Sequence, residues 1–127
     1  MSAKTIAILG ASNNRRKYGN KAVRAYHAQG FTVYPVNPHE DAIEGLPCYA
    51  SILDVPGSVE AVSIYLPPDK TLLVLEDVRE KNPEMVFLNP GSENDSVLAR
   101  AEDMGLNVLQ ACSIIAVGQN PYDLPED

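Results

Sequence analysis

A glycine-led turn followed by a run of cations is the part of this sequence best suited to chemistry. Residues 10–13, Gly-Ala-Ser-Asn, directly follow an apolar run at residues 5–9 and precede Arg15, Arg16 and Lys17. Glycine permits a tight turn and a close approach of the backbone to a ligand, and amides at a helix start bind phosphate oxygens. Hydroxyl and amide side chains add hydrogen bonds, and an arginine can hold a phosphate through two. The pattern therefore predicts a phosphate-binding loop, the alternative being an ordinary turn.

The charge of the chain is divided unevenly along its length. Residues 1–39 contain six basic residues and no acidic one, whereas residues 40–127 contain all 17 acidic residues and only four basic ones. An acidic body with a net charge of −7 argues against binding to nucleic acid. The basic cluster within it favours a small anionic, nucleotide-type ligand that meets one chosen spot. The alternative is that these cations belong to a solvated helix face.

Several well-known nucleotide-binding and catalytic patterns are absent from the sequence. There is no G-x-G-x-x-G, because Gly10 is followed by the next glycine only at Gly19, and Asn37 stands where a dinucleotide site carries an acid. The lack of a P-loop argues against nucleotide hydrolysis. No Ser/His/Asp set, carboxylate pair or metal-ligand spacing is recognisable, so we expect free thiols at Cys48 and Cys112 and no catalytic residues. Cys112 is either a thiol facing the ligand or, like most lone cysteines, a buried hydrophobe.

The alternation of apolar runs with helical patterns predicts how these residues are positioned. We expect strands at residues 5–9, 31–36, 61–66, 85–88 and 107–110. Helices are expected at residues 19–29, 69–81 and 92–104, with one short helical turn within residues 51–56. This order predicts an α/β fold of the Rossmann-like, doubly wound class, with a five-stranded, mainly parallel sheet and helices on both faces. One domain is expected over residues 1–127, with residues 118–127 as an acidic, proline-containing surface tail.

Local signals predict the ends and the surroundings of several elements. Pro35 lacks an N–H group, so we expect one side of the second strand to be unpaired near its end. Asp69 is expected to cap the second helix, and Ser92 with Asp95 resembles a capping box for the third. The wide apolar stripe at residues 72–78 predicts deep burial or a self-association face, which leaves a homodimer open.

The sequence also carries expectations about location. No run approaches the roughly 20 apolar residues that span a bilayer, so we expect no membrane insertion. Residues 1–4 lead directly into the first strand pattern and leave no room for a signal peptide. This predicts a cytoplasmic protein.

The loops that follow the strands form the candidate site, because ligands of doubly wound folds bind beyond the carboxyl ends of the strands. Five loops meet there: residues 10–18, 37–41, 65–69, 89–92 and 110–113. Asn37 can hydrogen-bond an adenine or ribose edge and His39, when protonated, a phosphate, the alternative being a polar turn. The prolines after Leu66 either stiffen a wall beside the ligand or simply stop the strand. The turn at Gly91 is either a second anion site or a capped loop.

These residues together resemble a known family. The small bacterial CoA-binding proteins are stand-alone relatives of the CoA-binding domain of succinyl-CoA synthetase α subunits. Their motifs are similar to the following stretches of this chain: Ile8-Leu9-Gly10-Ala11-Ser12 with Tyr18-Gly19, Val33-Tyr34-Pro35-Val36-Asn37-Pro38, Pro67-Pro68, Asn89-Pro90-Gly91-Ser92 and Cys112. The resemblance covers about residues 4–115.

The resemblance implies a Rossmann-like fold that binds CoA or an acyl-CoA. It implies that the first loop and nearby basic residues hold the phosphates, that Asn37 and Pro38 line the adenosine end, and that residues 65–67 wall the site. The full set of candidate binding residues is Gly10, Ala11, Ser12, Asn13, Arg15, Arg16, Lys17, Tyr18, Asn37, Pro38, His39, Tyr65, Leu66, Pro67, Asn89 and Gly91. Two departures weaken phosphate contacts: His39 stands where the family often has lysine, and Gln110-Ala111-Cys112 where its last strand commonly ends Asp-Arg-Cys.

Three functions follow from these expectations. The leading one is binding of CoA or an acyl-CoA without catalysis. The second is an enzyme acting on an acyl-CoA or another nucleotide-linked substrate, against which the missing acid–base set counts. The third is a protein-interaction module that has kept the fold and lost the ligand.

Overall fold

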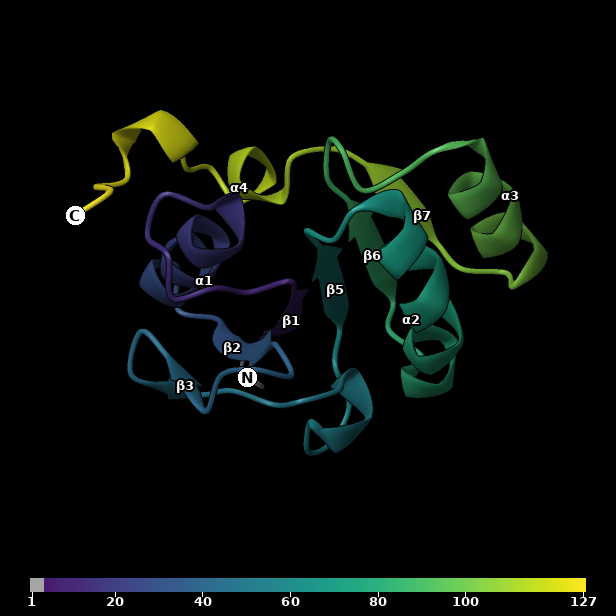
Figure 1. The fold of residues 1–127 in the computed structure, drawn as a ribbon, viewed down its shortest axis with the longest axis horizontal. Helices are drawn as coiled ribbons and strands as arrows, with labels where there is room; N and C mark the ends of the chain where they lie inside the picture. Colours follow the sequence, from purple (N-terminus) through teal and green to yellow (C-terminus); the bar gives the residue numbers. More distant parts are fainter. Residues whose placement is uncertain (1–3) are drawn as a thin grey trace.

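Five parallel strands form the centre of the computed structural model, which describes residues 4–127 (Figure 1). The strands are β1 (Thr5–Leu9), β2 (Thr32–Val36), β5 (Ala61–Ile64), β6 (Met85–Leu88) and β7 (Val108–Gln110), in the spatial order β2-β1-β5-β6-β7. All four pairings in this sheet are parallel. The expected doubly wound α/β fold is therefore confirmed. Residues 1–3, on which the expectation of a leaderless chain partly rests, lie outside the described residues.

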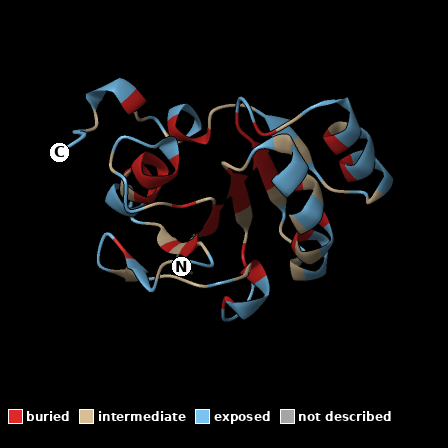
Figure 2. Ribbon diagram, in the orientation of Figure 1, coloured by how far each residue is buried: buried red, intermediate tan, exposed pale blue. Residues whose placement is uncertain are grey.

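Helices cover both faces of the sheet. Helix α1 (Tyr18–Ala28) and the short α4 (Ser113–Ala116) contact each other on one face, where their core includes Ile6, Ile8 and Val23. On the other face lie α2 (Pro68–Lys81), α3 (Asp95–Asp103) and the 3-10 turn η1 (Ile52–Asp54). Because successive side chains of a strand point to opposite faces, β1 supplies both cores, and Figure 2 shows the sheet as mostly buried.

The second strand lies at the edge of the sheet, but the side that Pro35 was expected to leave unpaired near its end is bridged at Val36 by Tyr49. Its outer side is partly covered by a small hairpin, β3 (Ala42–Ile43) and β4 (Leu46–Pro47), which no pattern in the sequence predicted. After the hairpin, the Tyr49 amide donates to the Pro35 carbonyl oxygen over 2.9 Å. This contact uses the acceptor of a residue that has no donor.

Both predicted helix caps are wrong. Helix α2 begins at Pro68, and its N-cap residue, Pro67, makes no side-chain cap hydrogen bond. A proline at the first helical position needs no cap for its own missing N–H group. Helix α3 is capped by Asn94, whose Oδ1 accepts from the Val97 amide over 2.9 Å, while Ser92 instead donates to the Asn89 carbonyl oxygen.

The apolar stripe of α2 is only partly buried. Leu75 and Val78 are fully buried against the sheet, but Leu73 is 80% exposed. Within residues 4–127 no helix is both long and apolar enough to cross a bilayer.

The acidic tail is packed on the body rather than detached from it. Residues 118–127 run beside α1 and contain the 3-10 turn η2 (Pro121–Asp123), whose Pro121 is buried (Figure 1). Leu124 packs against the α1 side of the core.

Candidate functional site

The strand order reverses at β1, whose neighbours β2 and β5 are reached by crossovers on opposite faces of the sheet. The carboxyl ends of strands at such a switch point form the usual binding crevice of this fold class. Two adjoining cavities lie there, of about 520 and 620 Å³. Both are lined by Gly10, Asn37, Leu66 and Lys70, so they meet along the loop that follows β1.

The larger cavity, which we call the cradle, has the chemistry of an anion site. Its wall combines the backbone of residues 10–12, the start of α1 and the side chains of Arg16, Lys17 and Lys70. None of the described residues that line it is an aspartate or a glutamate. Among the described residues, the backbone amides of Ala11 and Ser12 have no hydrogen-bond acceptor. Helix α1 also begins without a side-chain cap and without an acid in its first turn, which leaves its positive end available to an anion.

The conformation of the loop is fixed from beneath by a buried asparagine. Asn20 is fully buried in the first turn of α1, and its Nδ2 donates to the Ser12 carbonyl oxygen over 2.8 Å. The same nitrogen lies 3.0 Å from a Glu44 carboxylate oxygen, and its Oδ1 accepts from Arg24 Nε over 2.8 Å. A network centred on a buried side chain whose donors and acceptor are paired favours one backbone conformation. The loop carbonyls are thus turned toward the body and its free amides remain for a ligand.

Two glycines allow close contacts among the loop after β1, helix α1 and the residue that follows β5. Gly10 has φ +85°, and a Cβ atom there would lie 2.8 Å from the Tyr65 carbonyl oxygen. A Cβ atom on Gly19 would lie 2.2 Å from the Gly10 carbonyl oxygen, closer than such atoms approach. Gly19 therefore allows the close helix–loop packing that the last glycine of a dinucleotide fingerprint allows, although the spacing differs.

The smaller cavity is mainly apolar. Its wall comes from β1, the end of β2, η1 and α2, and includes Val36, Ile52, Leu66, Leu73 and Val74. A few polar groups stand among them, on Asn37, His39, Ser51, Lys70 and Asp77. This composition is typical of small-molecule sites, in which a few polar groups orient a ligand held by apolar contacts.

Most of the predicted residues gather at these two cavities. Around the cradle lie Gly10, Ala11, Ser12, Arg16, Lys17, Tyr18, Asn37, Tyr65, Leu66 and Pro67, and around the apolar cavity Pro38 and His39 join Gly10, Asn37 and Leu66.

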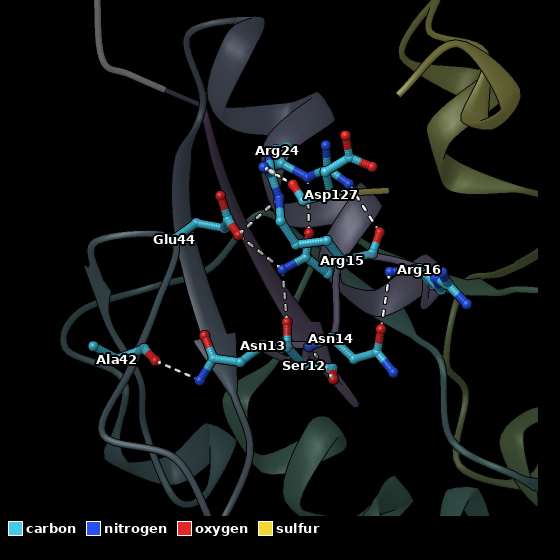
Figure 3. A network of polar contacts seen from close by, with 10 residues as sticks. Ser12, Asn13, Asn14, Arg15, Arg16, Arg24, Ala42, Glu44 and Asp127 are labelled. Atoms are coloured by element: carbon cyan, nitrogen blue, oxygen red, sulfur yellow. Dashed lines mark hydrogen bonds and ion pairs between the residues drawn. The ribbon is translucent and has the colours of Figure 1, made fainter. Parts of the chain in front are cut away.

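Asn13 and Arg15 line neither cavity, and both belong to the polar network of Figure 3. Asn13 Nδ2 donates to the Ala42 carbonyl oxygen over 3.0 Å and also to Glu40. Arg15 Nε lies 3.5 Å from Glu44, and another of its nitrogens donates to the Asp127 carbonyl oxygen. These two side chains pair with the hairpin region and the tail.

Asn37, which lines both cavities and was expected to contact a base or ribose, also makes hydrogen bonds within the protein. Its Nδ2 donates to the Ala11 carbonyl oxygen over 2.8 Å, and its Oδ1 accepts from the His39 amide over 2.8 Å. Both ends of the side chain are used inside the protein. Asn37 therefore joins the loop after β2 to the loop after β1 and positions both.

Asn89 and the turn at Gly91 lie outside both cavities. Asn89 is 1% exposed; its Nδ2 donates to Ser63 Oγ and the Ile64 carbonyl oxygen, and its Oδ1 accepts from the Ser113 amide. Ser113 Oγ lies 2.7 Å from Ser63 Oγ and 2.9 Å from the Tyr65 hydroxyl. This hub ties the loops after β5, β6 and β7 to the floor of the cradle.

Burial of the hub changes the acidity of its phenols. Desolvation raises the pKa of Tyr26, whose hydroxyl donates to the Ser113 carbonyl oxygen, to about 12. The pKa of Tyr65 is raised further for the same reason. Both hydroxyls therefore stay protonated at neutral pH and act as hydrogen-bonding groups.

Lys70, the one cation shared by both cavities, was not among the residues predicted from the sequence. It lies one residue beyond the predicted loop 65–69, in the first turn of α2. A basic residue directly after a switch-point loop was the available signal. Ser51 and Asp77 carried no comparable signal, because η1 and the middle of α2 reach the site only through the packing of α2 against η1.

The described residues contain no cluster of three histidine, cysteine or acidic side chains that could hold a metal ion. Cys48 and Cys112 are both free and partly exposed.

Known proteins share both the sequence and the fold. An ADP-forming acetate–CoA ligase II of Archaeoglobus fulgidus is 38% identical over 121 residues, which cover 92% of this chain and 18% of the ligase. A second ligase of that organism, ADP-forming acetate–CoA ligase I, is 30% identical over 119 residues, 92% of this chain and 17% of the ligase. The chain thus spans less than a fifth of the length of these curated relatives.

Solved structures agree. A conserved hypothetical protein from Pyrococcus furiosus superposes with a TM-score of 0.82 at 33% identity, covering 89% of this chain and 98% of that one. The dinucleotide-forming acetyl-coenzyme A synthetase 1 of Ca. Korarchaeum cryptofilum, solved with phosphate and ADP, superposes with a TM-score of 0.75 at 31% identity, over 86% of this chain and 26% of that one. The sequence pattern of the CoA binding domain matches residues 4–118. With its doubly wound sheet and its switch-point cavities, this chain belongs to the CoA-binding domain family.

Proposed function

We propose that this protein binds CoA or an acyl-CoA, with the phosphates in the cradle and the adenosine in the adjoining apolar cavity. The observation that carries the proposal is the junction of the two cavities at the loop after β1. On one side of the junction stand free amides and three cations without an acid; on the other stands an apolar wall. A nucleotide with an extended phosphate-linked arm has the same division between an anionic and an apolar part.

The same geometry favours CoA over dinucleotide cofactors that carry a free ribose diol. The tip of β2 bears Asn37 in place of an acid, and its side chain makes one hydrogen bond within the protein at each end. The usual carboxylate grip on a ribose diol is therefore missing at this position. Binding in this site needs only the phosphate and base contacts.

We propose binding without catalysis. The polar side chains around the cradle are cations, amides or hydroxyls, and the buried serine and tyrosine hydroxyls of the hub bond to one another. Serine activation requires a positioned base within hydrogen-bond reach, and Ser63 and Ser113 are paired instead with neutral hydroxyl and amide groups.

Isothermal titration calorimetry of the purified protein tests the proposal. The ligands are CoA, acetyl-CoA, NAD and ATP. We expect CoA and acetyl-CoA to bind with similar affinity, more tightly than NAD, because their shared part fills the site. The double variant Arg16→Ala/Lys17→Ala removes two cradle cations and should weaken CoA binding about tenfold or more.

A matched control is Lys4→Ala/Arg79→Ala, which removes two exposed cations that line neither cavity. It should bind CoA as the unmodified protein does. Absence of CoA binding at millimolar ligand would refute the proposal. Turnover of acetyl-CoA by the purified chain would replace it with the enzyme alternative.

A further inference from the structure

The C-terminal segment, residues 119–127, contacts Arg15 of the loop after β1 and Lys21 of α1. Glu126 Oε2 is 2.8 Å from Lys21 Nζ in the first turn of α1. The last carbonyl oxygen, on Asp127, accepts from Arg15, in the loop itself (Figure 3). The tail thus holds cations on both sides of the segment at which α1 begins.

The two partners of the ion pair between the tail and α1 differ in burial. The Lys21 side chain is 4% exposed and fixed in α1, with its ammonium 5.3 Å from the centre of the Tyr18 ring. The Glu126 side chain is 51% exposed and lies beyond Leu124, the tail residue that packs against the core. Among the described residues, Glu126 is the only acid in ion-pair contact with Lys21. Glu126 can therefore leave at small cost to its own solvation, whereas Lys21 remains in place.

Glu126 of the tail interacts electrostatically with a cation that lines the cradle. Tyr18 lines the cradle and contacts Lys21 through its ring, and Arg16 also lines the cradle. The pKa of Glu126 is lowered, chiefly by the hydrogen bond and charge of Lys21, with smaller contributions from Arg16 and Arg24. The field that Glu126 experiences thus includes a cation of the cradle. By reciprocity, a negative charge placed in the cradle disfavours the docked carboxylate, and the docked carboxylate disfavours that charge.

We propose that residues 119–127 are an acidic strap that lowers the affinity of the cradle for its anionic ligand, and that ligand binding loosens the strap. This inference rests on the proposed function, since it requires a negatively charged ligand in the cradle. The strap lies beside the cradle and lines no part of it, so its effect is electrostatic rather than a steric block. Docked, it neutralises Lys21; released, it returns the charge of Lys21 to the potential around the loop, while Arg15 keeps its ion pair with Glu44.

The first test is the variant Glu126→Gln. The amide oxygen still accepts a hydrogen bond from Lys21, so the fold is retained while the negative charge is removed. We expect the Kd for CoA to fall roughly threefold to tenfold at about 0.1 M salt, as expected for one charge within about 10 Å. The gain should shrink at about 0.5 M salt, where the interaction is screened. Glu102→Gln, at an exposed position of α3, is the control and should leave the Kd unchanged.

The second test needs no variant. Hydrogen–deuterium exchange of the unmodified chain with saturating CoA should show faster exchange in residues 119–127 and slower exchange in the loop after β1. An unchanged or weaker affinity of Glu126→Gln, or protection of the strap by CoA, would overturn the inference. If the unmodified protein does not bind CoA at all, the proposed function itself fails, and the two failures are thereby distinguished.

Discussion

At the scale of single residues, the most informative position is Lys70. It is exposed, belongs to the first turn of α2 and borders both cavities, so its ammonium can reach a phosphate at their junction. We predict that Lys70→Ala weakens CoA binding roughly threefold to tenfold, because one charge-assisted contact at a solvated site is lost. Calorimetry measures the effect.

Arg79→Ala is the matched control for Lys70, since it removes an exposed cation from the last turn of the same helix. It should leave the Kd unchanged. Equal affinities of Lys70→Ala and the unmodified protein would place the phosphates away from the junction.

Replacing Gly19 by alanine is predicted to destabilise the fold, although the same change usually stabilises a helix. In an ordinary helix, replacing glycine by alanine stabilises the fold by up to about 1 kcal/mol. Here the added methyl group would lie 2.2 Å from the Gly10 carbonyl oxygen, so the loop and helix must separate. We predict that Gly19→Ala lowers the free energy of unfolding by about 1–3 kcal/mol, the usual range for overpacking. Urea denaturation gives the value.

Gly57→Ala separates crowding from backbone strain. Gly57 has φ +71°, and no atom would lie within 4 Å of an added methyl group, so its replacement costs conformational strain alone, about 1 kcal/mol. It should leave CoA binding intact, whereas Gly19→Ala should weaken it by displacing the loop. A stabilised Gly19→Ala protein would contradict the close packing of the loop against α1.

Residue types predicted the polar character of the site better than the partner of each side chain. Gly10, Ser12 and Lys17 lie where the loop position predicted them. Asn37 and Asn89 are at the expected ends of their strands, yet their amides bond inward. An asparagine after a strand suits either a ligand or a neighbouring carbonyl, and only the packing of two distant loops decides between them.

At the scale of elements, short apolar runs bounded by turn residues predicted the strands, most directly the buried β1, β5 and β6. The expected 5–9 and 85–88 coincide with β1 and β6. The hairpin β3–β4 and helix α4 were missed because each is very short and is formed by contacts with the sheet edge and with α1. No local pattern signals such elements.

The hub that joins α1, β5 and α4 makes the stability of the fold depend on alkaline pH. Tyr26 has a pKa raised to about 12 by burial, and that of Tyr65 is also raised. In the unfolded chain a phenol titrates near pH ~10. Because the folded-state pKa is the higher one, the stabilisation is complete below about pH 10 and is lost as the pH rises from there through about 12.

We therefore predict that the free energy of unfolding, measured in urea, falls between about pH 10 and 12. Tyr26→Phe should flatten this fall and also lower stability at neutral pH by about 1 kcal/mol, because the Ser113 carbonyl oxygen loses one of its two donors and keeps the Val117 amide. Measurements near pH ~8, where both phenols are neutral, supply the reference. An identical alkaline slope in the two proteins would exclude Tyr26 as a source.

At the scale of the whole molecule, the sequence showed that basic residues gather in the first 39 positions, and the fold places two of them, Arg16 and Lys17, around the cradle. Five of the six basic residues of the first 39 positions belong to α1 and the loop before it, and the sixth, Lys4, precedes β1, whereas all the acids follow in the rest of the chain. The tail could not be placed from sequence, since its acids have no partner in the linear order. In the fold it returns to α1 and brings Glu126 to Lys21 across 105 residues.

This arrangement predicts how salt affects ligand binding. The net charge of −7 repels an anion at long range, whereas Arg16, Lys17 and Lys70 attract it at contact distance. Above about 0.1 M salt the Debye length is about 10 Å or less, so the distant acids are already screened and further salt acts on the cradle contacts. We predict that CoA affinity falls steadily between about 0.1 and 0.5 M potassium chloride in calorimetric titrations. The slope of log Kd against log salt should be shallower for Lys70→Ala, which has one contact fewer to screen. An affinity that rises with salt over this range would show that the acidic body, and not the cradle, controls access of the ligand.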